Sequence, residues 1–247
     1  MATIDINCDM GEGCPNDAEL MNYVSSVNIA CGAHAGDAEI MLRTVECAVD
    51  KGVAIGAHPG YADRENFGRF ALEMSHSEIY VLITEQFKTL KEIVDSVGGE
   101  IKHIKPHGAL YNEAARDAKL AAVIAKAVFA IAPNIVLYGL SGSESISQAK
   151  KLGLRTASEV FGDRTYQTNG SLTPRTEPNA LILDTDIAIA QVLQMVNDGT
   201  VNAIDGNVIP ITADTICIHG DGDNALEFAS AIRQSLMAAN INVAAKF

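Results

Sequence analysis

Short apolar runs alternate with longer amphipathic segments along the whole 247-residue chain. The runs are rich in Ile and Val, and several are apolar at consecutive positions, as expected for strands that are covered by helices. Seven strands are predicted, at residues 3–8, 27–31, 53–57, 101–105, 135–140, 156–161 and 215–218.

The segments between these runs have the periodicity and the end signals of helices. Asp37 is placed to cap a helix that Gly52 ends. Ser75 and Glu78 have the spacing of a capping box at the start of a longer helix. Further helices are predicted near residues 17–25, 117–131, 143–152, 185–198 and 223–239.

Strand–helix units in succession require parallel strands joined by right-handed crossovers. A doubly wound sheet and a barrel both satisfy this pattern, and we favour an α/β barrel with seven strands. No linker, low-complexity run or internal repeat divides the sequence. Residues 1–247 are therefore expected to form one domain, a length that is ordinary for such a barrel.

Polar side chains gather at the points where the predicted strands end. They are Asn7, Asp9 and Glu12 at the first strand, His34 and Asp37 at the second, His58 at the third, Lys105 and His107 at the fourth, Glu159, Asp163 and Arg164 at the sixth, and His219 and Asp221 at the seventh. The loops that follow the strands of a parallel barrel meet at one rim. We therefore expect these side chains to form one polar site.

Carboxylates, histidines and a lysine together suit acid/base catalysis or metal-assisted hydrolysis at a carbonyl carbon. Lys105 follows a buried strand, so it is expected to face a carboxylate or an anionic substrate. Asp37 is expected to cap its helix whatever else it does. Cys31 and Cys217 also lie near the rim, where we interpret them as small apolar fillers rather than nucleophiles. The mixed donor set does not select a particular metal.

Charge and composition exclude several partners. The net charge of −13 disfavours binding to nucleic acid and to anionic membrane surfaces, and no long apolar segment or leader is visible. Five cysteines without CxxC spacing predict neither a disulfide framework nor a zinc ribbon, so we expect reduced thiols in the cytoplasm.

Several nucleotide-binding and catalytic motifs are missing from the sequence. There is no GxxxxGK[ST], GxSxG or HExxH. The Gly/Ser-rich stretch GLSGSES at 139–145 opens a predicted helix, and its backbone N–H groups are able to hold an anion, although no Lys accompanies them.

Six motifs, DINCDMGEG, NIACGAHAGD, GAHPGYAD, IKPHGALYN, EVFGDRTY and ICIHGD, occur in an order and spacing that resemble the LamB/YcsF family. The resemblance extends from Asp5 to Asp221 and into the last helix. It implies a TIM-like barrel of seven strands, similar to the glycoside hydrolase/deacetylase group. It also implies cleavage of 5-oxo-L-proline (pyroglutamate) to L-glutamate with ATP as cosubstrate, by the A component of a 5-oxoprolinase that works with subunits B and C.

The resemblance also suggests roles for the polar set. Asp9, His58 and His107 are the first candidates for proton transfer, followed by Glu159 and His219, and Lys105 is expected to stabilise developing negative charge. The expected substrate contacts are Asn7, Glu12, His34, Asp37, Asp163, Arg164 and Asp221.

Two other functions stay open at this point. A divalent-metal-dependent deacetylase or amidohydrolase that acts alone predicts an ion among Asp9, His34, His58 and His219, with no need for ATP. A non-catalytic, lactam-binding regulatory protein of the same complex predicts ligand binding without turnover. The density of titratable groups disfavours the second, because simple binding pockets are mostly apolar.

Overall fold

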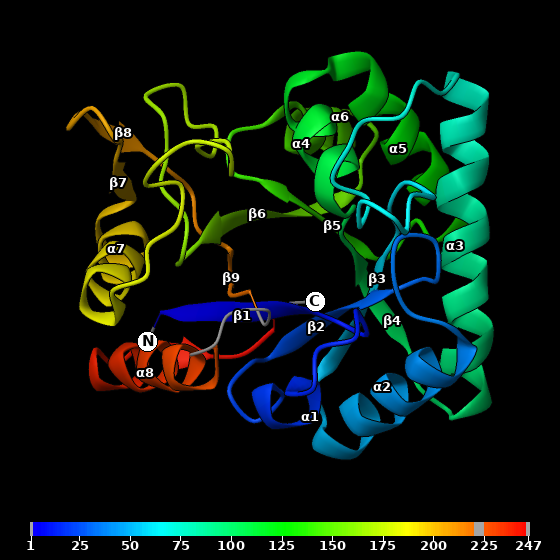
Figure 1. Cartoon of the computed structure of the whole chain (residues 1–247), viewed down its shortest axis with the longest axis horizontal. Helices are drawn as coiled ribbons and strands as arrows, with labels where there is room; N and C mark the ends of the chain where they lie inside the picture. Colours follow the sequence, from blue (N-terminus) through cyan, green and yellow to red (C-terminus); the bar gives the residue numbers. More distant parts are fainter. Residues whose placement is uncertain (1, 220–224, 246–247) are drawn as a thin grey trace.

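Strand β1 (Thr3–Met10) pairs in parallel with both β2 (Ser26–Ala30) and β9 (Thr215–Cys217), so the sheet closes on itself. The order around the resulting barrel is β1-β2-β3-β4-β5-β6-β9. The other strands are β3 (Ala54–His58), β4 (Ile101–Ile104), β5 (Val136–Leu140) and β6 (Arg155–Phe161). This computed structural model describes residues 2–219 and 225–245 (Figure 1), and it confirms the predicted barrel of seven parallel strands.

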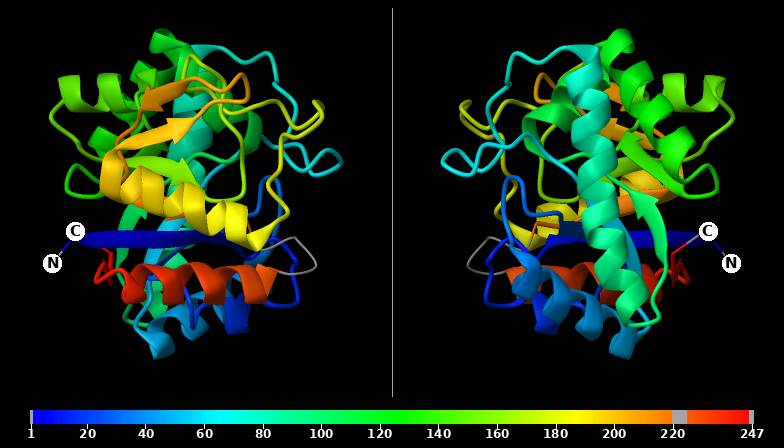
Figure 2. Two further views of the ribbon diagram at one scale, coloured as in Figure 1. Left: turned by 90° about the vertical axis from the view of Figure 1, so that its left-hand side faces the viewer. Right: turned by 90° about the vertical axis from the view of Figure 1, so that its right-hand side faces the viewer.

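Helices cover the outside of the barrel (Figure 2). They are the short α1 (Asp17–Leu20), α2 (Ala38–Lys51), α3 (His76–Ser96), α4 (Gly108–Arg116), α5 (Ala118–Ile131), α6 (Glu144–Lys151), α7 (Thr185–Asp198) and α8 (Ala225–Ala238). The predicted caps of α2 and α3 are confirmed. Asp37 accepts a hydrogen bond from the Ile40 N–H at 2.9 Å, and Ser75 and Glu78 form a capping box.

Four local features differ from the sequence-based prediction. The helix predicted at 17–25 ends at Leu20, because the chain turns there and the Tyr23 N–H donates to the Leu20 carbonyl at 2.9 Å. Helix α4 is not predicted by the sequence pattern. The same is true of the antiparallel hairpin of β7 (Thr200–Asn202) and β8 (Val208–Pro210), and of β10 (Asn242–Val243), which pairs with the start of β1. These strands have two or three residues, too few to show a period.

The apolar core lies between the strands and the helices, whereas the inside of the barrel is polar. In β1, Ile4, Ile6, Cys8 and Met10 belong to the core, while Asp5, Asn7 and Asp9 alternate with them and meet polar side chains of other strands. This follows from the two-residue period of a strand, which directs alternate side chains to opposite faces. No helix in the described ranges combines the length and the apolar character needed to cross a membrane.

Candidate active site

The barrel interior is closed at its amino-terminal end by Asp5. Its carboxylate accepts hydrogen bonds from four hydroxyls, those of Ser25 at 2.6 Å, Ser26 at 2.8 Å, Tyr138 at 2.9 Å and Thr215 at 2.6 Å. A buried charge is tolerated when hydrogen bonds replace its hydration, and Asp5 is only 2% exposed. The amino-terminal end of the barrel interior is therefore filled by polar side chains that hydrogen-bond to one another.

A second polar layer lies above Asp5 and supports the site. Asn28 donates from Nδ2 to Asn7 Oδ1 at 2.7 Å and to Asp9 Oδ1 at 2.8 Å. His103 contacts Asn28 Oδ1 through Nε2 at 2.7 Å, and its ring occupies the space beside Gly56, where a Cβ would lie 2.1 Å from Nε2. Asn7 is fully buried in this layer, so it positions the residues above it instead of lining the cavity.

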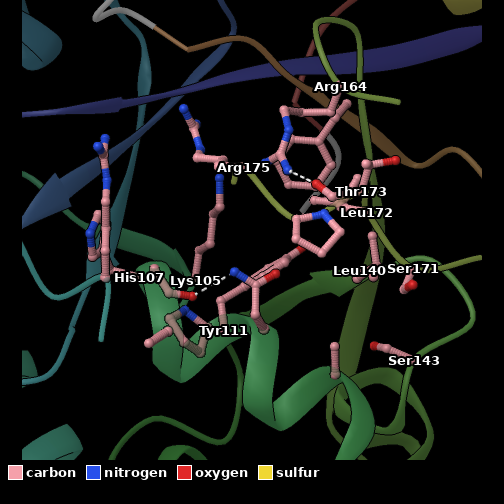
Figure 3. A pocket seen from close by; sticks show the side chains of 18 of the residues that line it. Lys105, His107, Tyr111, Leu140, Ser143, Arg164, Ser171, Leu172, Thr173 and Arg175 are labelled. Carbon is pink, nitrogen blue, oxygen red and sulfur yellow. Dashed lines mark hydrogen bonds between the residues drawn. The ribbon is translucent and has the colours of Figure 1, made fainter. Parts of the chain in front are cut away.

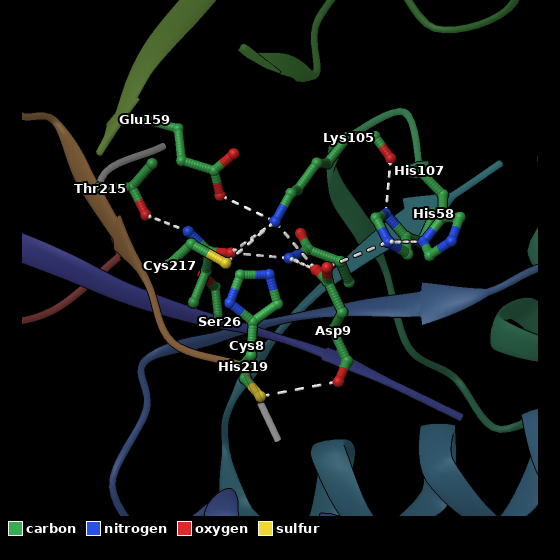
Figure 4. A network of polar contacts seen from close by, with 12 residues as sticks. Cys8, Asp9, Ser26, His58, Lys105, His107, Glu159, Thr215, Cys217 and His219 are labelled. Carbon is green, nitrogen blue, oxygen red and sulfur yellow. Dashed lines mark hydrogen bonds and ion pairs between the residues drawn. The ribbon is translucent and has the colours of Figure 1, made fainter. Parts of the chain in front are cut away.

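Lys105 lies at the centre of the third layer, between a carboxylate from β1 and one from β6, the two strands that flank β9 (Figure 4). Its Nζ is 2.9 Å from Asp9 Oδ1 and 2.9 Å from Glu159 Oε1, and it is also 3.2 Å from Cys217 Sγ. Burial alone would lower the pKa of Lys105, but these neighbours raise it well above its ordinary value. Lys105 therefore contacts two carboxylates where at least one was predicted, and its ammonium group stays charged.

Three histidines and Glu12 form a compact group beside Asp9. Glu12 Oε1 is 3.1 Å from His34 Nε2, 3.1 Å from His107 Nδ1 and 3.7 Å from His58 Nε2. His58 Nε2 is also 3.2 Å from Asp9 Oδ2. The His34 and His107 rings are stacked with their centroids 3.8 Å apart, so His34 supports the group from behind.

Backbone carbonyls fix the tautomers of two of these histidines. His58 donates from Nδ1 to the Lys105 carbonyl at 2.8 Å, and His107 donates from Nε2 to the Phe67 carbonyl at 2.9 Å. A carbonyl only accepts, so the remaining nitrogens, His58 Nε2 and His107 Nδ1, face each other at 2.9 Å with their lone pairs inward. Two such lone pairs need a shared proton or a cation between them.

The charges of the group agree with this geometry. Burial lowers the pKa of His34 to about 4, so this ring is neutral near pH 7. Burial would raise the pKa of Glu12, but the close contacts of its carboxylate with His107 and His34 outweigh it and lower the pKa to about 2. Burial would likewise lower the pKa of His58, and the Asp9 carboxylate reverses this and raises it. Glu12 and Asp9 are therefore anionic beside His58.

The quartet of Glu12, His34, His58 and His107 has the donors of a divalent-metal site. One ligand atom from each lies within 4.8 Å of the others. Imidazole nitrogens and a carboxylate oxygen suit zinc and other first-row divalent ions, and the inward lone pairs of His58 and His107 fit such an ion. Of the metal ligands expected from the sequence, His34 and His58 belong to this quartet, whereas Asp9 and His219 do not.

His219 belongs to a separate pair at the carboxyl ends of β6 and β9. Its Nδ1 is 2.5 Å from Asp163 Oδ2, and its ring lies against Phe161 with centroids 5.8 Å apart. Burial would raise the pKa of Asp163, but His219 lowers it, so the pair is an ionised aspartate that orients an imidazole. This pair has the form of an acid/base dyad.

These groups lie at the base of a cavity of about 850 Å³ (Figure 3). Of the predicted site residues, the cavity is lined by Asp9, Glu12, His58, Lys105, His107, Arg164 and His219. His34, Glu159 and Asp163 contact these lining residues from behind. Asp37 instead caps α2, and Asp221 lies outside the described residues.

Tyr111 is a lining residue that the sequence reasoning did not single out. Burial, and then the Glu159 carboxylate, raise the pKa of its hydroxyl well above its ordinary value, so the phenol stays protonated. It follows His107 by four residues, one helical turn into α4. Helical residues four apart lie on the same face, so a prediction of α4 from the sequence would have placed Tyr111 beside His107 in the site.

A closed parallel barrel with titratable side chains and a candidate metal-binding quartet at the carboxyl ends of its strands defines this chain as an α/β barrel with the architecture of many enzymes. The sequence model of the LamB/YcsF family matches residues 4–246, and the chain belongs to that family.

Relatives and solved structures agree with this assignment. A protein from Brevibacillus brevis, named as the A subunit of 5-oxoprolinase, is 52% identical over 252 residues, which cover 100% of this chain and 99% of that protein. The crystal structure of the lactam utilization protein from Thermus thermophilus is 40% identical, with a TM-score of 0.92, and the match covers 99% of this chain and 100% of that one. A family 4 carbohydrate esterase from Streptomyces lividans, in complex with acetate, is 13% identical with a TM-score of 0.53 over 98% and 91% of the two chains; it shares the fold alone.

Proposed function

We propose that this chain is the A component of an ATP-dependent 5-oxoprolinase and that, with subunits B and C, it opens 5-oxo-L-proline to L-glutamate. Its similarity to a protein that carries the 5-oxoprolinase name, over the full length of both, supports this proposal. The structural observation that carries it is the position of Lys105, held between Asp9 and Glu159 next to the inward nitrogens of His58 and His107.

The reaction needs activation, because a lactam carbonyl is a poor electrophile. Transfer of the ATP γ-phosphoryl group to the lactam oxygen yields ADP and an activated ring carbon. Water then adds to that carbon, and the carbon–nitrogen bond breaks as the nitrogen takes a proton, which leaves an acyl phosphate. A second water hydrolyses the acyl phosphate and releases L-glutamate and phosphate. The sequence contains no P-loop, so we assign the phosphoryl transfer to the complex with subunits B and C.

The residues of the cavity divide the remaining tasks. His58 or His107, with Asp9 and Glu12 beside them, accepts the proton of the attacking water. The Lys105 ammonium stabilises the negative charge that develops on oxygen. The Asp163–His219 pair, on other strands, delivers a proton to the departing nitrogen. If Glu12, His34, His58 and His107 held a divalent ion, the inward nitrogens of His58 and His107 would be its ligands instead of bases, and the ion would polarise the carbonyl group.

The test is glutamate release from 5-oxo-L-proline and ATP, with this chain alone and then with subunits B and C. We expect turnover only in the full mixture, and its loss when His107→Ala replaces the wild-type chain. No turnover in a mixture whose B and C subunits work with a homologue of this chain would refute the proposal. Binding of 5-oxo-L-proline without turnover in that mixture would indicate a regulatory role.

The metal-competent quartet supports a second candidate, a divalent-metal-dependent deacetylase or amidohydrolase that acts alone. It predicts release of acetate or amine from N-acetylated substrates in the presence of Zn²⁺ or Mn²⁺ and without ATP. Activity that a chelator removes, and that subunits B and C do not increase, would favour this function over the first.

We place the protein in the cytoplasm, since Cys8, Cys31 and Cys217 are buried free thiols and no disulfide joins cysteines in the described part of the chain.

A further inference from the structure

The cavity has a second half, remote in sequence from the histidines, that the proposed chemistry does not use. It is formed by the start of α6 and by the segment between β6 and α7, and its polar lining includes Ser143, Arg164, Ser171, Thr173 and Arg175 (Figure 3). Ligand cavities have volumes of about 300–1,000 Å³. At about 850 Å³ this one is larger than a small lactam beside Lys105 requires.

Ser143 is an N-cap residue that does not cap its helix. Its side chain makes no hydrogen bond to the first turn of α6, although serine at this position ordinarily does. The residue is 9% exposed, and its Oγ is buried without a hydrogen-bond partner in the described structure. An unsatisfied buried hydroxyl costs free energy, so one that lines a cavity indicates a ligand atom as its partner.

Two arginines supply positive charge to the same half. Arg164 is 6% exposed, and its guanidinium donates to the carbonyls of Thr173 at 2.6 Å and Ala180 at 3.2 Å. These bonds hold the segment that carries Arg175. Burial, followed by the nearby charge of Arg175, lowers the pKa of Arg164, which shows that the two cations share one region.

The ion pairs of the described residues include neither of these two cations. Among residues 2–219 and 225–245, no carboxylate oxygen lies within ion-pair distance of Arg164 or Arg175, although the chain has 31 acidic and only 18 basic residues. Arg164 is buried and Arg175 is exposed at the cavity, and an oxyanion between them would form charge-assisted hydrogen bonds with both guanidinium groups. The first N–H groups of α6 lack acceptors within the helix and favour the same charge.

We propose that Ser143, the start of α6, Arg164 and Arg175 form an oxyanion subsite that holds the anionic group of the substrate, a carboxylate or a phosphoryl group, while the reacting carbon faces Lys105 and the histidines. The assignment of the anion to the carboxylate of a lactam acid rests on the proposed function, whereas the subsite itself does not.

The test is direct binding by calorimetry, with three probes: 5-oxo-L-proline, the neutral lactam 2-pyrrolidinone and inorganic phosphate. Ser143→Ala and Arg175→Gln are compared with Ser147→Ala, which lies on the same helix away from the cavity, and with Arg43→Gln on α2. Loss of a hydrogen bond to a charged group is worth about 1.5–3 kcal/mol, so each cavity variant is expected to weaken oxyanion binding about 10- to 100-fold. Binding of 2-pyrrolidinone should not change.

The probes separate the two sources of the anion. Weakened 5-oxo-L-proline binding identifies a carboxylate, and weakened phosphate binding alone identifies a phosphoryl group. Equal binding of both oxyanions by the wild-type chain and both cavity variants, or binding of neither by the wild type, overturns the subsite. Turnover by the complex with unaltered binding in both cavity variants would refute the subsite and leave the proposed function standing. Loss of phosphate binding in the cavity variants, with no turnover by the wild-type complex, would support the subsite and refute the proposed function.

Discussion

His58 Nε2 lies 2.9 Å from His107 Nδ1, although each ring already donates its other N–H to a backbone carbonyl. Two lone pairs at this distance repel each other unless a proton or a cation lies between them. Glu12 and Asp9 place negative charge beside the pair and favour either occupant. This relationship leads to the first prediction.

The chain should retain about one divalent ion after dialysis against Zn²⁺ or Mn²⁺. Replacement of a ligand, in Glu12→Gln or His107→Ala, should lower the affinity for the ion at least about tenfold, because three donors remain. Metal analysis by mass spectrometry provides the measurement. His76→Ala serves as the control, since His76 begins α3 at the surface. A His107→Ala chain that holds the ion as tightly as the wild type would contradict the assignment.

Lys105→Met should decrease the free energy of unfolding by about 3–5 kcal/mol, because it leaves the buried carboxylates of Asp9 and Glu159 without their cation. Adding Glu159→Gln should recover part of the stability, since one uncompensated charge is removed, but no activity. Urea unfolding measures both changes. Lys102→Met is the control, because Lys102 is on the same strand but partly exposed. Equal free energies of unfolding for the two single lysine variants would show that Lys105 does not stabilise the buried carboxylates.

Asp17→Asn should stabilise the protein near neutral pH. Burial raises the pKa of Asp17 to about 6, although its Oδ2 accepts a 2.7 Å hydrogen bond from the Gly11 N–H. The folded chain therefore binds this proton more tightly than the unfolded chain does. The resulting stability is fully present below pH 3.8 and is lost as the pH rises through about 6.

At pH 7.5 the neutral amide side chain of this variant should increase the free energy of unfolding by about 1–2 kcal/mol, a value reduced for partial exposure. At about pH 3.5 most of the gain should vanish, because the carboxyl group is then largely protonated in both states. Thermal unfolding at the two pH values measures the difference, with Glu19→Gln on the same short helix as an exposed control. A gain of equal size at both pH values would show that the carboxyl charge is not its cause.

Gly56→Ala should destabilise the barrel by about 1–3 kcal/mol or more, because the new Cβ would overlap the His103 ring. The double variant Gly56→Ala with His103→Ala should be more stable than the sum of the two single changes predicts, since the smaller side chain removes the overlap. A double-mutant cycle in urea provides the coupling free energy. Additive effects would mean that the two positions do not compete for space.

The sequence by itself determined the seven barrel strands, the capped helices α2 and α3, and the rim where polar side chains gather. Periodicity of two and of 3.6 is local, so Asp37 and the Ser75–Glu78 pair could be assigned correctly from their neighbours alone. The alternation of Asp5, Asn7 and Asp9 with Ile6 and Cys8 also indicates that one face of this strand is polar, and that face lines the interior of the barrel. The alternation indicates which face of the strand a side chain lies on, but not how deep in the barrel it lies or which side chain it contacts.

Tertiary structure alone decided which polar residues meet. Asn7 and Asp9 are two residues apart on the same face of β1. Asn7 is nevertheless buried in the layer below the cavity, whereas Asp9 contacts Lys105, which lies 96 positions away in the sequence. Glu12 and His107 join His34 and His58, while His219 pairs with Asp163. Such contacts depend on the closure of β1 on β9 and on loop geometry. Hydrogen bonds and ion pairs act over a few ångströms, so they are determined by positions in space that no local pattern specifies.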